Sequence, residues 1–137
     1  MALISVTRLR VRSLRYLPGF FFYALRSSRQ AKRAKGNLAV GVLNDAKRTF
    51  WTRTAWQDEP AMREFMMTPP HRKAMAKLLD WCDEAALVHW VQNSAELPDW
   101  TEAHSRLQRE GRPSKVRRPS QAQRAFEISP PNCRGGL

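Results

Sequence analysis

The sequence contains few cysteines, no long apolar run and, over its first quarter, no acidic residue. Its two cysteines, Cys82 and Cys133, are too few for a disulfide framework, and neither has a second Cys or a His at the spacing of a zinc site. The apolar stretch 17–25 has less than half of the roughly 20 residues that a membrane-spanning helix needs. We therefore expect a cytoplasmic protein without a membrane span or a metal site.

Positive charge is gathered at the two ends of the chain. The formal net charge is +12, and residues 1–36 hold nine Arg and Lys but no Asp or Glu, whereas 37–112 are close to neutral. Such a basic surface is typical of proteins that bind nucleic acid or an anionic membrane. The aromatic run Phe20 to Phe22 lies among these cations, as in a helix that rests on a membrane surface. One alternative is therefore a non-enzymatic protein that holds an anionic partner, and the other is a merely solvated basic face.

Apolar periodicity switches between two patterns along the first two thirds of the chain. Period-two spacing indicates strands, and i, i+3, i+4 spacing indicates helices. Asp58 and Thr68 are expected helix caps, each followed by proline. The resulting order, βαββαβ, is that of an α+β ferredoxin-like fold with an antiparallel sheet. Strands are expected at 3–12, 38–43, 49–56 and 86–92, with helices at 16–35, 58–67 and 68–82.

The helix expected over 16–35 carries a single apolar stripe, which we expect to pack on the sheet. Pro18 and Gly36 mark its two ends. The residues of the apolar stripe fall at i, i+3, i+4, i+7 and i+8 and are Leu17, Phe20, Phe21, Ala24 and Leu25.

Composition divides the chain into three parts. The ferredoxin-like domain is expected over 1–93, and Trp100, Leu107 and their neighbours indicate a helical extension over 94–112. Residues 113–137 are rich in proline and glycine and poor in large apolar side chains, which predicts a disordered basic tail.

Both faces of the expected sheet are apolar. On the last strand, for example, Val88 and Trp90 oppose Leu87 and Val91. Because this fold covers only one sheet face with its own helices, the other face would be a large exposed apolar patch. The pattern therefore favours a homodimer in which two such faces pack together.

Polar side chains on two strands indicate a ligand cavity beside the sheet, if their face lines the space between the two packed sheets. We expect His89 to project into this cavity together with Arg53 and Trp51. Arg53 would stabilise a phenolate or enolate that reacts directly with oxygen, and Trp90 would add an apolar wall. The alternative is that Arg53 and His89 are structural dimer contacts and that the tryptophans belong to the core.

A third histidine, His71, lies on the apolar stripe of the helix expected over 68–82. It is a candidate proton shuttle or axial ligand at the mouth of the cavity. The alternative is a half-buried structural histidine near a helix start. Phe65, from the preceding helix, is a candidate substrate-binding residue.

The segment 52–62, Thr-Arg-Thr-Ala-Trp-Gln-Asp-Glu-Pro-Ala-Met, followed by Phe65 and His71, resembles the strand–helix signature of antibiotic biosynthesis monooxygenase-like proteins. These proteins belong to the dimeric α/β-barrel superfamily, which includes quinone-forming oxygenases and haem degraders. The resemblance covers roughly 1–93. It implies a ferredoxin-like fold, a homodimer, and binding or cofactor-independent oxidation of a small aromatic or polyene substrate.

The haem-degrading members of that superfamily resemble one another in an Asn on the first strand and a Trp and a haem-ligating His on the second helical segment. The corresponding positions here are Thr7, Phe65 and Met75, and none has the required side chain. His71 lies one helical turn before the expected ligand position. The resemblance therefore implies a protein without haem, unless His71 serves as a shifted ligand.

Overall fold

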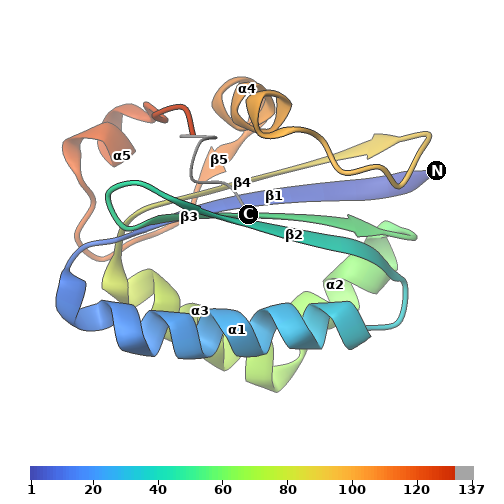
Figure 1. Cartoon of the computed structure of the whole chain (residues 1–137), viewed down its shortest axis with the longest axis horizontal. Coiled ribbons are helices and arrows are strands. Elements are labelled where there is room, and N and C mark those ends of the chain that lie inside the picture. The colour runs from blue at the N-terminus through green and yellow to red at the C-terminus, as the bar shows by residue number, and fades with distance from the viewer. Residues whose placement is uncertain (132–137) are drawn as a thin grey trace.

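The computed structural model describes residues 1–131; residues 132–137, including Cys133, lie outside the described part. A five-stranded antiparallel sheet in the order β2-β3-β1-β4-β5 separates two helical layers (Figure 1). The strands are β1 (Ala2–Val11), β2 (Asn37–Asp45), β3 (Thr49–Trp56), β4 (Cys82–Gln92) and β5 (Arg112–Pro113). The first layer contains α1 (Leu17–Arg33), α2 (Glu59–Met67) and α3 (Pro69–Trp81), and the second contains α4 (Trp100–Glu110) and α5 (Gln121–Ala125). None of the helices in residues 1–131 is long and apolar enough to cross a membrane.

The first four strands and the first helical layer confirm the predicted ferredoxin-like fold. β1 lies between β3 and β4 and is antiparallel to both. Asp58 caps α2 as expected, because its Oδ1 accepts a hydrogen bond from the Ala61 N–H at 2.9 Å. Thr68 precedes α3 but makes no side-chain cap, since its hydroxyl donates to the Phe65 carbonyl instead.

β4 is longer than the sequence predicts. The expected helix over 68–82 ends at Trp81, and Cys82 is already the first residue of the strand. Cys82 is fully buried, and this burial raises the pKa of its thiol to about 12. A neutral thiol of this kind packs as a small apolar side chain.

The second helical layer corrects the expectation of a disordered tail over 113–137, because residues 113–131 are folded. We call residues 97–128 the C-terminal layer. Leu107 is fully buried against the sheet, and Ile128 joins the same core. Gln123 explains how a polar segment is held: its carboxamide bonds both the N–H and the carbonyl of Ala85, at 3.0 and 2.9 Å. A side chain therefore supplies the pairing that a further strand would give.

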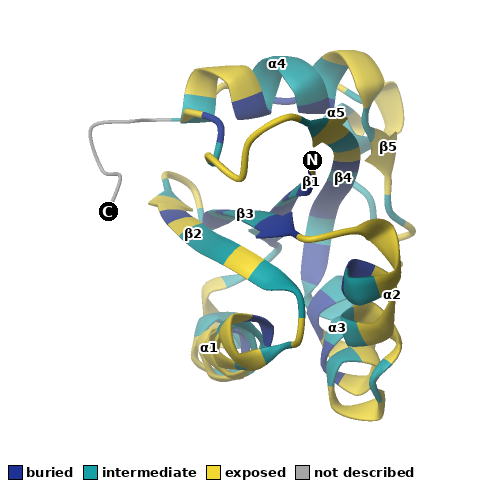
Figure 2. Cartoon of the chain, turned by 90° about the vertical axis from the view of Figure 1, so that its right-hand side faces the viewer, coloured by how far each residue is buried: buried dark blue, intermediate teal, exposed yellow. Residues whose placement is uncertain are grey.

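The C-terminal layer also removes the argument for a homodimer that packs sheet against sheet. That argument required an uncovered apolar face, yet Ile4, Val6 and Val88 of this face are buried beneath α4 and the residues that follow it (Figure 2). The cover comes from the same chain. Formation of a homodimer stays a prediction, but an uncovered apolar sheet face no longer supports it.

A buried ionic cluster fastens the C-terminal layer to the sheet. Arg8 and Glu84, 5% and 3% exposed, form an ion pair at 2.7 Å, and Arg10 bonds the second carboxylate oxygen at 2.8 Å. Ser120 of the C-terminal layer donates its hydroxyl to that same oxygen at 2.9 Å. Burial opposes ionisation of Glu84, but the hydrogen bonds from Arg8 and Ser120 and the charges of Arg8 and Arg10 outweigh it, so the pKa lies below its usual value.

Candidate functional site

A pocket of about 370 Å³ lies between the first helical layer and the sheet. This volume is within the range of small-molecule sites. Its walls come from α1, α2, α3 and the helix-facing side of β1 to β4, so nearly every element of the ferredoxin-like unit contributes. The large apolar lining residues include Phe20, Phe50, Trp56, Met62, Phe65, Met75 and Leu78.

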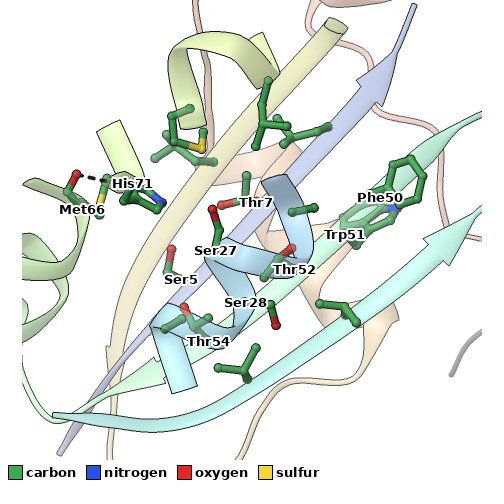
Figure 3. Close-up of a pocket in the computed structure, with 18 of the residues that line it drawn as sticks. Ser5, Thr7, Ser27, Ser28, Phe50, Trp51, Thr52, Thr54, Met66 and His71 are labelled. Atoms are coloured by element: carbon green, nitrogen blue, oxygen red, sulfur yellow. Dashed lines mark hydrogen bonds between the residues drawn. The ribbon is translucent and has the colours of Figure 1, made fainter. Parts of the chain in front are cut away.

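Hydroxyl groups form the polar part of the lining. Ser5 of β1 pairs directly with Thr54 of β3, and Thr7 pairs with Thr52, so all four side chains face the helices. α1 adds Ser27 and Ser28 from the opposite wall, and Figure 3 shows the six side chains around one space. Sequence analysis missed this set, although the Thr-x-Thr alternation of 52–54 was its visible signal.

Two of these hydroxyl groups are free to bond a ligand. Thr54 accepts a hydrogen bond from the Trp56 indole N–H at 2.9 Å, which leaves the Thr54 proton available for donation. Ser27 has a buried hydroxyl oxygen without a hydrogen-bond partner in the described residues. A buried polar atom left unpaired is costly, so a ligand that bonds Ser27 would gain this unmet bond.

The structure places His71 in the lining of the pocket. Its ring lies 4.4 Å from the Phe65 ring, between centroids, and Phe65 in turn stacks on Trp56 at 5.3 Å. Nδ1 is 3.3 Å from the Met66 carbonyl, which can only accept, so Nδ1 carries the proton. Nε2 is then the free lone pair, and Figure 3 shows this edge of the ring toward the hydroxyl groups.

The electrostatics keep His71 neutral. Burial lowers the pKa of the imidazole, while the hydrogen bond to Met66 raises it by less. A neutral imidazole with an exposed lone pair is suited to accept a proton from a bound ligand.

We expect an NMR titration to give His71 a pKa below the ordinary value of about 6.5. Because its folded pKa is depressed, His71 contributes stability that is present above about pH 6.5 and is lost as the pH falls through the folded pKa. The imidazole signal is assigned by its loss in His71→Gln. A measured pKa of about 6.5 or above for His71 would contradict the expectation that burial favours its neutral form.

His89 lies at the rim of the same pocket. It is exposed, and it shares the helix-facing side of β4 with Leu87. Partial loss of solvent around its ring is the main cause that lowers its pKa, the charge of Arg112 lowers it further, and the charge of Glu59 opposes both. His89 was expected in a cavity between two packed sheets, but it borders a pocket between the sheet and the helices, and Arg53 does not accompany it.

Arg53 does not share the pocket with His89, which corrects the expected site. Val6 pairs with both Arg53 and Val88, so Arg53 points to the opposite sheet face from His89. There Arg53 donates to the Pro98 carbonyl and stacks on the Trp100 ring at 4.2 Å. Alternation within β3 and β4 separates the two faces of each strand. It does not tell which face of β3 lies on the same side of the sheet as a given face of β4, because that depends on the pairing register.

Trp51 and Trp90, the two tryptophans expected to bind substrate, both contact the C-terminal layer. Trp51 borders the pocket through β3, but its indole is fully buried and packs against Trp100. Trp90 lies under the guanidinium of Arg106 at 4.6 Å. Both side chains therefore pack in the contact between sheet and C-terminal layer, and Phe65 lies in the pocket lining.

The pocket does not fit haem. The three positions of the haem-degrading pattern, Thr7, Phe65 and Met75, all line it with unsuitable side chains. No Arg or Lys of residues 1–131 lines it to pair with the propionates. The described residues also contain no group of three His, Cys, Asp or Glu that would hold a metal ion. An uncharged lining instead suits a neutral ligand.

Several solved structures share this architecture. SnoaB of Streptomyces nogalater, a cofactor-independent oxygenase, superposes in a mutant form with a TM-score of 0.59 at 15% identity, covering 68% of this chain and 94% of its own. Putative antibiotic biosynthesis monooxygenases of Nitrosomonas europaea (TM-score 0.60, 16% identity, 66% and 89% covered) and Bacteroides thetaiotaomicron (0.61, 16%, 71% and 94%) are similar. The protein thus has the fold of antibiotic biosynthesis monooxygenase-like proteins. No curated protein matches the chain.

The chain itself belongs to the family described as Domain of unknown function (DUF3291), whose model matches residues 14–128. This range includes the C-terminal layer. The layer is therefore part of the family's unit, whereas the solved structures cover only about two thirds of the chain.

Proposed function

We propose that this protein binds a small neutral aromatic molecule in the pocket beneath α1 and oxidises it with molecular oxygen. The observation that carries the proposal is the lining itself: aromatic and methionine side chains, a set of serine and threonine hydroxyl groups, two histidines with lowered pKa values, and no Asp, Glu, Lys or Arg among residues 1–131. Such a lining holds an apolar ring and orients it by a few hydrogen bonds. The similarity to SnoaB supports oxygenation as the class of reaction.

His71 is the base in the proposed reaction, and hydroxyl groups of the lining take the stabilising role that the sequence suggested for Arg53. A phenolic substrate gives its O–H proton to Nε2 of His71, and donors such as Thr54 and Ser27 stabilise the phenolate. The phenolate passes one electron to oxygen, and the two radicals join in a C–O bond. His71 returns its proton to the peroxide anion, and the resulting hydroperoxide loses water by cleavage of its O–O bond and of the C–H bond at the same carbon. Substrate and oxygen thereby become quinone and water.

The experiment is oxygen uptake and quinone absorbance with a series of neutral phenols of one to three fused rings, beginning with 1-naphthol. We expect one oxygen consumed per quinone formed, with no added cofactor. Quinone formation no faster than in buffer across the series, despite binding of the phenols, would leave a ligand-binding protein and contradict the oxidation. Absence of binding would contradict the pocket assignment as well.

A further inference from the structure

Exposed apolar side chains surround the opening of the pocket. Phe21, Leu25, Val42 and Met66 line it, yet 47%, 55%, 45% and 37% of their surfaces are exposed. The sequence stripe predicted Phe21 and Leu25 to be buried, which is therefore wrong. Single exposed apolar residues are ordinary, but four around one opening mark a contact surface.

The neighbouring surface of α1 is strongly basic. Phe22 is 56% exposed beside Arg26, whose guanidinium lies 5.5 Å from the ring centre. α3 lies next to α1 in the same layer and contributes Lys77, whose ammonium is 5.9 Å from the Tyr23 ring. The exposed cations of this surface, none of them in an ion pair within residues 1–131, are Arg26, Arg29, Lys32, Arg33, Lys35, Arg72, Lys73 and Lys77.

We propose that this α1 surface docks on an anionic membrane and that the apolar ligand enters the pocket from the bilayer. Cations contact the lipid head groups, while Phe21, Leu25 and Met66 reach the acyl boundary. Nucleic acid would satisfy the cations but offers no apolar region for these side chains. The source of the ligand rests on the proposed function, whereas the docking itself does not.

The test is co-sedimentation of the full-length protein with vesicles of phosphatidylcholine, with and without phosphatidylserine. We expect binding only with phosphatidylserine, weakened by salt. The variant Arg26→Glu/Arg29→Glu should lower partitioning by at least about 25-fold, at about fivefold for each cation. The matched control Arg109→Glu/Arg124→Glu makes the same change of charge on exposed residues of the C-terminal layer and should bind as the wild type does.

Three results would overturn the docking. The first is failure of the wild-type protein to sediment with anionic vesicles, and the second is equal loss of binding in both double variants, which would indicate a net-charge effect. The third is a single-stranded RNA that binds the wild type more tightly than the vesicles do, with no effect of Phe22→Ser on vesicle partitioning, which would assign the surface to nucleic acid. Binding of a neutral fluorescent probe to the pocket without vesicles is measured in parallel, so that failure of docking and failure of the pocket are distinguished.

Discussion

Replacing His71 by glutamine is expected to slow oxidation of a phenolic substrate by about 10²- to 10⁴-fold, the usual contribution of a general base. The glutamine amide can still donate to the Met66 carbonyl, so the side chain stays in place, but it cannot accept the proton. Affinity for the neutral phenol should change little. Steady-state oxygen uptake over a range of phenol concentrations separates kcat from KM.

The pH dependence distinguishes a base from a packing residue. In the wild type the rate should rise as His71 loses its proton, with an apparent pKa below about 6.5, because burial depresses that pKa. This step should vanish in His71→Gln. His104→Gln is the matched control, since His104 bonds the Ile128 carbonyl in the C-terminal layer, outside the pocket. Equal rates for the wild type and His71→Gln would refute the assigned base.

Removing the carboxylate of Glu84 is expected to destabilise the protein by about 3–5 kcal/mol, because a buried arginine is left without its partner. Arg8 is 5% exposed and cannot turn to solvent, and Ser120 loses its acceptor. The C-terminal layer should loosen at the same time. Urea unfolding of Glu84→Ala measures the loss.

The surface pair of Glu102 and Arg106 is the control, since Glu102→Ala removes a partner 3.7 Å away at an exposed helical site and should cost roughly 0.5 kcal/mol or less. The difference in unfolding free energy between the wild type and Glu84→Ala also depends on pH. Its folded pKa is depressed, so its contribution is present above the unfolded value of about 4.3 and disappears as the pH falls through the folded one. A loss in Glu84→Ala no larger than in Glu102→Ala would show that the buried cluster does not hold the layer.

The fold was predictable from local pattern as far as α4, although the start of β4 was placed four residues too late, at 86 instead of at Cys82. Strands and helices followed from apolar periodicity, and β3 has the predicted bounds. The helix expected over 94–112 is present as α4, but beyond it the pattern fails, because residues 113–131 are held by polar groups such as Gln123 and Ser120 whose partners are distant in sequence. A segment of this composition is predicted to be disordered, because the sequence does not show which distant residues will form hydrogen bonds with it.

The candidate site was predictable in part. His71 and Phe65 follow from helical spacing and do line the pocket. The pairing of Arg53 with His89 failed because the face of a residue depends on strand register, which local alternation does not fix. The hydroxyl groups were missed for a related reason, since Ser5 and Thr54 meet only across two strands.

Ligand binding at the pocket is the central claim, and the most direct measurement is titration of the neutral fluorescent probe N-phenyl-1-naphthylamine into two tryptophan variants of α1. Ser28→Trp places an indole inside the pocket, whereas Arg29→Trp places the same side chain on the exposed surface next to it. With both variants folded, we expect the probe to bind the wild type and Arg29→Trp alike and to bind Ser28→Trp at least tenfold more weakly, roughly 1.4 kcal/mol. Equal affinity for all three proteins would contradict the account, because the probe would then bind outside the pocket.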